Sequence, residues 1–560
     1  MRYSLVAAAM VVLAGCAGVL GFDEFIVGPG TTDAGDDAAP SGEADLYVSV
    51  EGNDESDGSR QRPVRSIARA LQLARVALAE RKTVQRIAVC SGDYVERSLE
   101  VVGGIHVRGG YDCASWARAA TEQSLALRIP PSTKLVSGAP DVTFVRLRAD
   151  DLGAPRLDGL SIETTQAHSA IDVVGEATLV DVFVSNTTSP QDEEPHQVLA
   201  ANKANVTIER AYLAIAQGGA TGNAISIGVG ASESTLVLRD NVFDLSSTAG
   251  SCQGIVATTS TVVAERNRLD LVDCRGTIVS SQELSAAVGV VVVDSKLESR
   301  RNTIRIDRPR RFEAGRTGAV GLTVLSGELE SDGDRMIGPV LLGSQATAVR
   351  FVGVYVTARA KIVNASIFVD SRHYVLDNGS AGVHLAEGAG ESAIAHNSMY
   401  FSAPVPGDRV RSYGILIDES IKSPSITIES NVAMTDNPDA MLLRVGSCAQ
   451  SGIGKLANNY HGGFAAPVYV SDAGGCTLDD LVDGGAAANT ALPCDAGSCG
   501  AVFESTEVVS VVANGLRPVP AAACAQLRVP SSPGVLVDGT GKPRTDGGST
   551  TAGAFEVGCD

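Results

Sequence analysis

The amino-acid sequence predicts an all-β fold in which one chain winds as a single-stranded parallel β-helix. Three observations lead to this prediction. Two sequence markers recur with a period near thirty residues, each unit contains only short alternating strands, and one helical segment stands before the periodic region. Two independent markers that share one period indicate structural repeats of similar size.

The first marker is a small residue followed by alternating aliphatic residues, and its steps are 29 to 35 residues long. The second marker is a polar residue between two alternating strands, with steps of 26 to 35 residues. The first begins at Ala224, Gly254, Gly289, Gly321, Gly353, Gly382 and Gly414. The second is centred on Asn241, Asn267, Asn302, Asp334, Asn364, Asn397, Asn431 and Asn458.

Units of this length exclude other repeat architectures. A propeller blade needs about forty residues, and ankyrin repeats need helices that these units lack. We therefore expect coils of two or three short strands, with aliphatic side chains inward and each strand paired to its equivalent one coil on. The repeated Asn is expected at a corner, because Asn tolerates the left-handed conformation and can bond the Asn stacked above it. The repeated Gly is expected at another corner.

Residues 1–15 predict a lipoprotein signal peptide. Arg2 precedes an apolar run that is too short to span a bilayer as a helix. The ending Leu13-Ala14-Gly15-Cys16 resembles the lipobox of bacterial lipoproteins, which implies cleavage before Cys16 and lipid on its thiol. The alternative is a plain secretion signal whose Cys16 pairs elsewhere. The expected location is the cell envelope, with the lipid on Cys16 holding the chain to a membrane.

Ala17 follows Cys16, which fits delivery to the outer membrane under the sorting rule of enteric bacteria. Residues 16–44 have hardly an apolar side chain after Val27 and predict a flexible tether. Residues 45–150 are expected to form an N-terminal cap and the first coils. A helix over roughly Ser66 to Ala79 would cover the open end of the core with Ile67, Leu71, Ala74 and Leu78.

Eleven cysteines, of which ten remain after Cys16, indicate disulfides formed in an oxidising compartment. Spacing does not determine connectivity, and pairing between sequence neighbours is the simplest arrangement. A zinc site needs C-x-x-C or Cys/His pairs, which are missing, so no metal is expected. The neighbour pairs are Cys90 with Cys113, Cys252 with Cys274, Cys448 with Cys476, Cys494 with Cys499, and Cys524 with Cys559.

Several phrases resemble the opening module of bacterial right-handed β-helix proteins of the pectin-lyase-like class. They include Tyr47-Val48-Ser49, Gly52-Asn53-Asp54 and Gly109-Gly110-Tyr111, and Gly553-Ala554-Phe555-Glu556 resembles the closing motif of that class. The resemblance implies a right-handed β-helix and says little about function, because this class includes lyases, hydrolases, epimerases and adhesins. We expect residues 45–150 to form the N-terminal cap and first coils and residues 151–445 to form the parallel β-helix. Residues 446–560 are expected to form disulfide-rich C-terminal coils and a cap.

A net charge of −20 argues against nucleic acid as a partner, and no motif indicates a cofactor. The acidic loop 53–58 lacks the Glu that an EF-hand needs at position twelve, where Val64 stands. A basic cluster is the sharpest local anomaly and is a candidate site for an acidic glycan or lipid phosphates, with a solvated loop as the alternative. Its members are Arg300, Arg301, Arg305, Arg308, Arg310, Arg311 and Arg316.

His373, His384 and His396 fall on adjacent predicted coils, close enough to share a face, although the simpler interpretation is isolated outward histidines on a polar surface. No catalytic residue can be assigned, since no pair of carboxylates is distinguished from the others. The predicted function is a surface-anchored, non-catalytic binding or structural lipoprotein that contacts polysaccharide or another envelope component. The alternative is a polysaccharide lyase or epimerase, for which three or four stacked carboxylates beside an outward Lys or Arg in a groove would be expected.

Overall fold

The computed structural model describes residues 45–555 with internal gaps, so Cys16 and the predicted signal peptide and tether lie outside the described residues. The segments not described are 1–44, 82–84, 119–128, 139–142, 166, 189–194, 218–224, 248–249, 275–276, 280–281, 285–286, 308–316, 341–348, 371–379, 405–410, 422–424, 449–450, 471–476, 483–488, 493–498, 507–509, 512–513, 521–526, 531–534, 536, 545–548 and 556–560.

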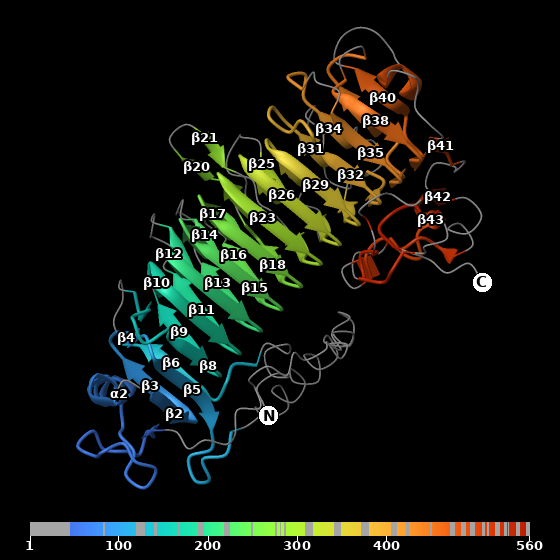
Figure 1. Ribbon diagram of the computed structural model, residues 1–560. Helices are drawn as coiled ribbons and strands as arrows, with labels where there is room; N and C mark the ends of the chain where they lie inside the picture. The colour runs from blue at the N-terminus through green and yellow to red at the C-terminus, as the bar shows by residue number, and fades with distance from the viewer. Residues whose placement is uncertain are drawn as a thin grey trace, which may run out of the picture.

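The chain forms a single-stranded right-handed parallel β-helix, as the sequence predicts (Figure 1). Each coil contributes strands to three faces, and every strand pairs in parallel with the equivalent strand of the next coil. We call them the first, second and third face in the order in which the chain passes through a coil. The third face is a separate sheet of 14 strands, whereas the first and second faces join into one sheet of 25 strands.

The strands of each face follow in chain order. The first face contains β4 (Leu99–Val102), β7 (Val145–Arg148), the first halves of β10 (Ser169–Val180) and β12 (His196–Glu209), β14 (Ser226–Ser232), β17 (Cys252–Thr258), β22 (Ala287–Val293), β25 (Thr317–Val324), β28 (Val349–Val356), β31 (Ser380–Leu385), β34 (Ser412–Ile417), β37 (Met441–Val445) and β40 (Ala466–Val470). The second face contains β1 (Leu46–Val48), β2 (Gln85–Cys90), β5 (Ile105–Tyr111), β8 (Arg156–Asp158), the second halves of β10 and β12, β15 (Thr235–Arg239), β18 (Thr261–Glu265), β23 (Ser295–Arg300), β26 (Gly327–Asp332), β29 (Arg359–Val363), β32 (Ala393–Ala395), β35 (Ile426–Glu429) and β38 (Ile453–Ala457). The third face contains β3 (Gly92–Glu96), β6 (Thr133–Ser137), β9 (Ser161–Thr165), β11 (Phe183–Thr188), β13 (Tyr212–Gln217), β16 (Val242–Ser247), β19 (Arg268–Val272), β24 (Thr303–Asp307), β27 (Arg335–Val340), β30 (Ser366–Val369), β33 (Ser398–Phe401), β36 (Val432–Thr435), β39 (Tyr460–Gly462) and β41 (Thr490–Ala491).

One continuous core fills the coil, because alternate side chains of every strand point inward. Its buried members run from Leu46 at the first strand to Leu481 at the far end. Outside the coil, β20 (Thr277–Val279) and β21 (Gln282–Leu284) form an antiparallel hairpin. Among the residues that the structure describes, no helix combines the length and apolarity needed to cross a bilayer.

The N-terminal end of the core is covered by α2 (Ile67–Arg81), which confirms the predicted capping helix. Ile67, Leu71, Ala74 and Leu78 are all buried in the core, as their helical spacing predicts. The acidic loop helps the helix begin, because Asp54 Oδ1 accepts hydrogen bonds from the backbone N–H groups of residues 65 and 66 at 2.9 and 2.8 Å. Asp54 thus holds the two residues before the helix, and the first helical N–H group, that of Ile67, donates to Glu96 Oε1 at 2.8 Å.

The repeated polar residue forms a buried ladder at the corner between the second and third faces. The side-chain amide of Asn241 donates to Asn267 at 2.9 Å, and Asn267 donates to Asn302 at the same distance. The expected stacking is confirmed, but the left-handed conformation falls one residue earlier, as at Asp240 (φ 55°). Of the predicted set, Asn364 and Asn458 occupy this left-handed position and not the ladder.

The prediction that the repeated Gly turns a corner is wrong. These glycines lie inside first-face strands, starting at Gly228 in β14; Ala224 lies outside the described residues. A Cβ on Gly289 would lie 2.5 Å from the carbonyl oxygen of Gly321 and 2.6 Å from the Ile304 side chain. Along the column from Gly228 to Gly382, each Cβ would meet the next glycine's carbonyl oxygen at 2.4 to 2.7 Å. Glycine is needed here for close packing of neighbouring coils.

The C-terminal end of the core meets η2 (Leu478–Leu481), whose Leu481 is buried in it. The described part of residues 499–555 packs along the side of the last coils, beside and not beyond them (Figure 1). This segment includes η3 (Cys499–Val502) and the antiparallel pair β42 (Arg528–Pro530) and β43 (Ser549–Thr551). It buries outward apolar side chains of the third face, namely Ile337, Phe368, Tyr400, Val432, Met434 and Tyr460.

Two of the predicted disulfides are present. Cys90 pairs with Cys113, and Cys252 pairs with Cys274 within one coil. Cys448 and Cys499 are also disulfide-bonded. The three remaining neighbour pairs each involve at least one cysteine outside the described residues, so they stay predictions.

Candidate functional site

The candidate site lies on the outer side of the first face, across β28, β31 and β34. Strand pairing aligns Tyr355 with His384 in the next coil, and His384 with Leu416 in the coil after that. Their sequence neighbours Val354, Val383 and Ile415 are buried in the core, so this column points outward. The fold thereby brings together side chains that are about thirty residues apart in sequence.

His384 joins two charged side chains from neighbouring coils. Arg350 Nη2 lies 3.0 Å from His384 Nδ1, and His384 Nε2 lies 2.9 Å from Asp418 Oδ1. A guanidinium group can only donate, so Nδ1 accepts and Nε2 donates to the carboxylate. The His384 side chain is 9% exposed and that of Asp418 is 41% exposed, so the carboxylate is the end of this chain that solvent reaches.

The surroundings favour the ionised form of Asp418. The hydrogen bond from His384 lowers the pKa of Asp418 against the opposing effect of burial, and Arg444 and Arg350 lower it further. The Tyr355 ring lies edge-on to the His384 ring with 4.9 Å between centroids. Burial and the nearby Asp418 carboxylate raise the pKa of the Tyr355 hydroxyl, so this tyrosine stays neutral.

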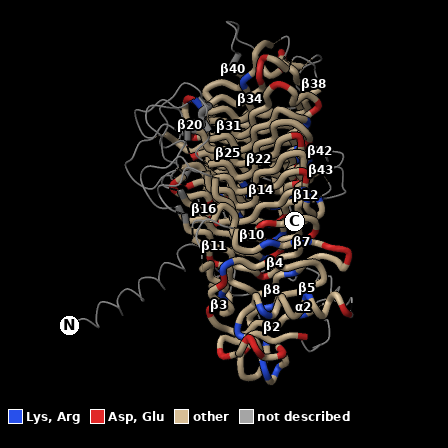
Figure 2. Tube along the Cα trace, turned by 90° about the vertical axis from the view of Figure 1, so that its left-hand side faces the viewer, with Lys and Arg blue, Asp and Glu red and all other residues tan. Residues whose placement is uncertain are grey.

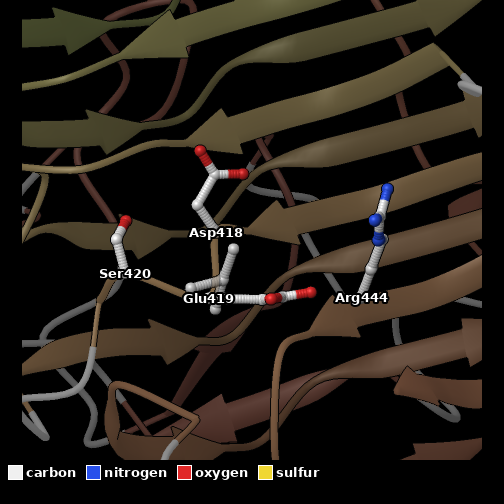
Figure 3. A pocket seen from close by; sticks show the side chains of 5 residues that line it. Asp418, Glu419, Ser420 and Arg444 are labelled. Carbon is white, nitrogen blue, oxygen red and sulfur yellow. The ribbon is translucent and has the colours of Figure 1, made fainter. Parts of the chain in front are cut away.

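A polar hollow of about 290 Å³ opens beside this chain of hydrogen bonds. Ile417, Asp418, Glu419 and Ser420 line it where β34 ends, and Arg444 of β37 closes the other side. Figure 3 shows the carboxylate of Glu419 directed toward Arg444, with Asp418 beside it.

The Arg444 guanidinium also lies over the ring of Tyr413, 5.5 Å from its centroid, and this contact fixes its position. The hollow therefore presents two carboxylates, a hydroxyl and a guanidinium at known places. Such groups can donate to and accept from the hydroxyl groups of a ligand.

His384 and His396 do not share a face, and His396 is not an outward histidine. His384 lies on the first face, whereas His396 is buried at the corner between the second and third faces in the left-handed conformation. Burial, together with nearby Arg544, lowers the pKa of His396 to about 3. His373 lies outside the described residues. Sequence periodicity placed His384 and His396 within the coil but did not predict that His396 is buried at a corner.

Sequence reasoning missed Asp418, Arg444 and Tyr355. A signal for part of the site was present, since Tyr355 and His384 each stand two residues after the glycine of their coil. That shared offset aligns them on the outer side of the first face. Arg444 continues the same column, since strand pairing aligns it with Leu416, but no glycine stands two residues before it to mark its coil. Asp418 lies after the end of β34 and outside the column.

The basic cluster is divided between two faces. Arg300 pairs with Glu298 on the second face at 2.9 Å, and Arg305 pairs with Asp307 on the third face at 2.6 Å. Arg301, at the corner between them, pairs with Glu265 at 3.0 Å. Arg308, Arg310, Arg311 and Arg316 lie outside the described residues, so an anion site there stays a prediction.

A small array of carboxylates lies on the third face. Asp244, Asp270 and Arg305 are aligned by strand pairing in three successive coils. Asp244 accepts from the Tyr212 hydroxyl at 2.5 Å, and Asp270 pairs with Arg268 at 2.9 Å. The array has two stacked carboxylates, fewer than expected for a lyase, and lies on a different face from the hollow. The described residues contain no group of three His, Cys, Asp or Glu side chains arranged to hold a metal ion.

Comparison with known proteins adds little to this picture. No family model and no curated protein matches the chain. Similar solved structures include pectate lyase Pel9A, with 13% identity over 93% of this chain and 98% of that chain and a TM-score of 0.29.

Another is a PL6 alginate lyase complex with trisaccharide, with 10% identity over 74% of this chain and 85% of that chain and a TM-score of 0.29. A third is the catalytic domain of a GH87 alpha-1,3-glucanase in complex with nigerose, with 12% identity over 76% of this chain and 68% of that chain and a TM-score of 0.30. Similarity at this level gives no information about the site.

Proposed function

We propose that this chain is a non-catalytic, surface-anchored module that binds a glycan in the hollow formed by Asp418, Glu419, Ser420 and Arg444. The observation that carries the proposal is the arrangement of fixed donors and acceptors around a polar hollow on the outer side of the coil. Sugar hydroxyl groups both donate and accept hydrogen bonds. Carboxylates accept from them and a guanidinium donates to them, which is the complementarity such a ligand needs.

Tyr355 supplies the second element of the proposal. Its ring is partly exposed beside His384, within the same outward column. An aromatic ring next to polar groups offers an apolar surface against which a sugar ring can pack. The ligand would then lie along the first face, in contact with more than one coil.

The protonation states support binding over catalysis. A general acid that works near neutral pH needs a raised pKa, and the pKa of Asp418 is lowered instead. Both ring nitrogens of His384 already have partners, Arg350 and Asp418, so the imidazole has no free nitrogen for a substrate proton. The polysaccharide lyase or epimerase therefore stays the alternative, to be decided by experiment.

The anchoring part of the proposal rests on the lipobox-like sequence at Cys16. Lipid on that cysteine would hold the body at a membrane of the cell envelope, with outer-membrane delivery expected from Ala17. Mass spectrometry of the purified full-length chain would detect the acylated cysteine. An unmodified Cys16 in the mature chain would contradict this part without affecting the glycan site.

The glycan site can be tested with purified protein on a glycan array, followed by calorimetric titration of the ligands found. The test variant is Asp418→Asn, and the matched control is Asp240→Asn. Asp240 is 42% exposed, close to the 41% of Asp418, but its partner is Arg266 and it lies at another corner of the coil. We expect Asp418→Asn to weaken binding about tenfold, the loss of one charge-assisted hydrogen bond, and the control to bind normally.

Product formation separates the two functions. Each ligand is incubated with the protein while the ultraviolet absorbance of unsaturated uronates is followed. If the parent protein releases unsaturated product and the Asp418→Asn variant does not, then the protein is a lyase and the binding proposal is wrong. Equal binding by Asp418→Asn and the unmodified protein would show that the ligand lies elsewhere.

A further inference from the structure

Two opposite charges face each other across the hollow without forming an ion pair. Among the residues that the structure describes, the Glu419 carboxylate has no hydrogen-bond or ion-pair partner. Arg444 also has no ion pair there, although Figure 3 shows Glu419 directed toward it. The contact that Arg444 does make is with the Tyr413 ring, which offers no carboxylate to its N–H groups. Both charges can therefore bind a ligand.

Packing fixes where these two charges lie. Arg444 is aligned with Leu416 by strand pairing, and the Tyr413 side chain that its guanidinium contacts is buried. Glu419 lies against Gly446, since a Cβ on that glycine would fall 2.4 Å from Glu419 Cγ and 2.7 Å from its Cβ. The missing side chain at position 446 thus lets Glu419 approach the coil that carries Arg444.

Asp418 adds a second carboxylate beside Glu419. The hydrogen bond from His384 reaches Asp418 Oδ1, and Oδ2 has no hydrogen bond with any described residue. Both acidic side chains are accessible to solvent, because Asp418 is half-buried and Glu419 is exposed. An ammonium group has three donors, enough to bond one oxygen of each carboxylate. A guanidinium has paired N–H donors that fit a carboxylate at two points.

The arrangement of charges disfavours a ligand of one sign. A wholly anionic glycan would be repelled by the two carboxylates and by a chain whose net charge is −20. Figure 2 shows acidic positions along the length of the coil, from α2 at the N-terminal end to β38. A wholly cationic glycan would be repelled by Arg444. A ligand that carries both signs can place each of its charges opposite a group of the other sign and avoid both repulsions.

We propose that the glycan in this hollow carries both an ammonium and a carboxylate, the ammonium held by Asp418 and Glu419 and the carboxylate held by Arg444. The inference rests on the proposed glycan site and names the chemical class of its ligand. The hollow of about 290 Å³ is near the lower end of small-molecule sites, about 300 to 1,000 Å³, so it accepts one charged sugar unit with its substituents. The rest of the glycan would lie along the first face, past Tyr355.

Four sugars with the same ring separate the contributions of the two charges. N-acetylglucosamine is neutral, glucosamine carries the ammonium, N-acetylmuramic acid carries the carboxylate, and muramic acid carries both. Their dissociation constants are measured with the purified protein by ligand-observed NMR at about pH 6, where an amine and a carboxyl group are both ordinarily charged. We expect muramic acid to bind about fivefold more tightly than either singly charged sugar.

Two variants remove one charge each. Glu419→Gln should reduce the advantage of muramic acid over N-acetylmuramic acid, because the ammonium loses one of its two carboxylates. Arg444→Gln should abolish the advantage of muramic acid over glucosamine, because the carboxylate loses its cation. The effect on neutral N-acetylglucosamine should be smaller, since glutamine still donates and accepts hydrogen bonds. The matched controls are Glu391→Gln and Arg359→Gln, which are exposed and do not line the hollow, and both should bind like the parent protein.

Two results would overturn the inference. One is that muramic acid binds no more tightly than the singly charged sugars. The other is that all four sugars lose affinity equally in both variants, since the hollow would then bind hydroxyl groups alone. The glycan array judges the proposed glycan site separately. Ligands found on the array without a preference for muramic acid would contradict only this inference, whereas an array without ligands would contradict the glycan site as well.

Discussion

Arg544 Nη2 donates to the side-chain oxygen of Asn364 at 2.6 Å, across 180 residues of sequence. The contact lies at the corner where the Asn ladder is interrupted, because Ala365 stands in the ladder position. Asn364 in turn donates to Asp332 at 2.7 Å and to the backbone of the C-terminal segment at 2.9 Å. The C-terminal segment thus supplies polar contacts at the one coil between Asn241 and Asn489 whose ladder residue is apolar.

Replacing Arg544 with Ala should loosen the C-terminal segment. The side chain is 4% exposed and also donates to the carbonyls of residues 551 and 553 at 2.9 and 2.8 Å, so its loss leaves buried acceptors without donors. We expect the free energy of unfolding to fall by about 3 kcal/mol. We also expect a protease to cleave the variant early after residue 498, and mass spectrometry of the fragments would detect this cleavage. Lys542→Ala, exposed in the same segment, should have no such effect.

Asp334 should make stability depend on pH in the opposite sense to an ion-paired carboxylate. Burial raises its pKa from the ordinary value of 3.8 to about 6, although Ser331, Ser299 and Asn302 donate to it. The folded state then holds the proton more tightly than the unfolded chain, so the free energy of unfolding falls as pH rises from about 3.8 to about 6.

Asp334→Asn should remove this loss of unfolding free energy, because the amide has no proton to lose. Its oxygen can still accept from Asn302, as Asn does in the neighbouring coils. We expect the variant to be more stable at pH 7.5 by on the order of 2 kcal/mol, and the advantage to shrink toward pH 4. Urea denaturation of both proteins at the two pH values measures it. A variant that is less stable at both would mean that the ladder requires the carboxylate.

The glycine column should not accept a methyl group. In Gly289→Ala the new Cβ would meet backbone of the next coil at 2.5 Å, so the coils must separate, at a cost of about 3 kcal/mol. Gly390→Ala is the control, since its Cβ would meet only Ser425 Oγ, at 3.5 Å. Thermal and urea denaturation of the two variants should differ clearly. Equal stability would remove the close-packing explanation.

His384→Phe should change the pH range of ligand binding. Without the hydrogen bond from His384 the pKa of Asp418 rises toward its ordinary value, so the carboxylate is lost at higher pH as the solution is acidified. Calorimetric titration of the glycan at several pH values should show binding that fails at higher pH in the variant than in the parent protein.

His168→Phe, an exposed histidine before β10, is the control for this pH profile. If the profile of His384→Phe matches that of the parent, then the Asp418 carboxylate does not hold the ligand. Either substitution should leave the core inside the coil intact, because neither His384 nor His168 belongs to it.

The sequence predicted much of the architecture for a simple physical reason. Each coil buries its own aliphatic residues and stacks its own Asn, so local alternation and a fixed period contain most of the information. The capping helix was predictable in the same way, since its stripe from Ile67 to Leu78 needed only an apolar surface to cover. The prediction for the glycines was wrong because glycine is suited both to a tight turn and to a close contact between backbones, and the sequence does not distinguish the two.

The candidate site was not predictable, because its members depend on which face of the coil a residue occupies. Asp418 follows the end of β34 and His396 turns a buried corner, and the repeat period records neither placement. Arg444 continues the column of Tyr355 and His384, but its coil lacks the glycine that marks the other coils. By itself, the sequence determined a parallel β-helix with a capped end, because burying aliphatic residues at regular spacing has few solutions. Tertiary structure alone decided which charges became neighbours, since polar contacts between coils depend on distances that alternation does not fix.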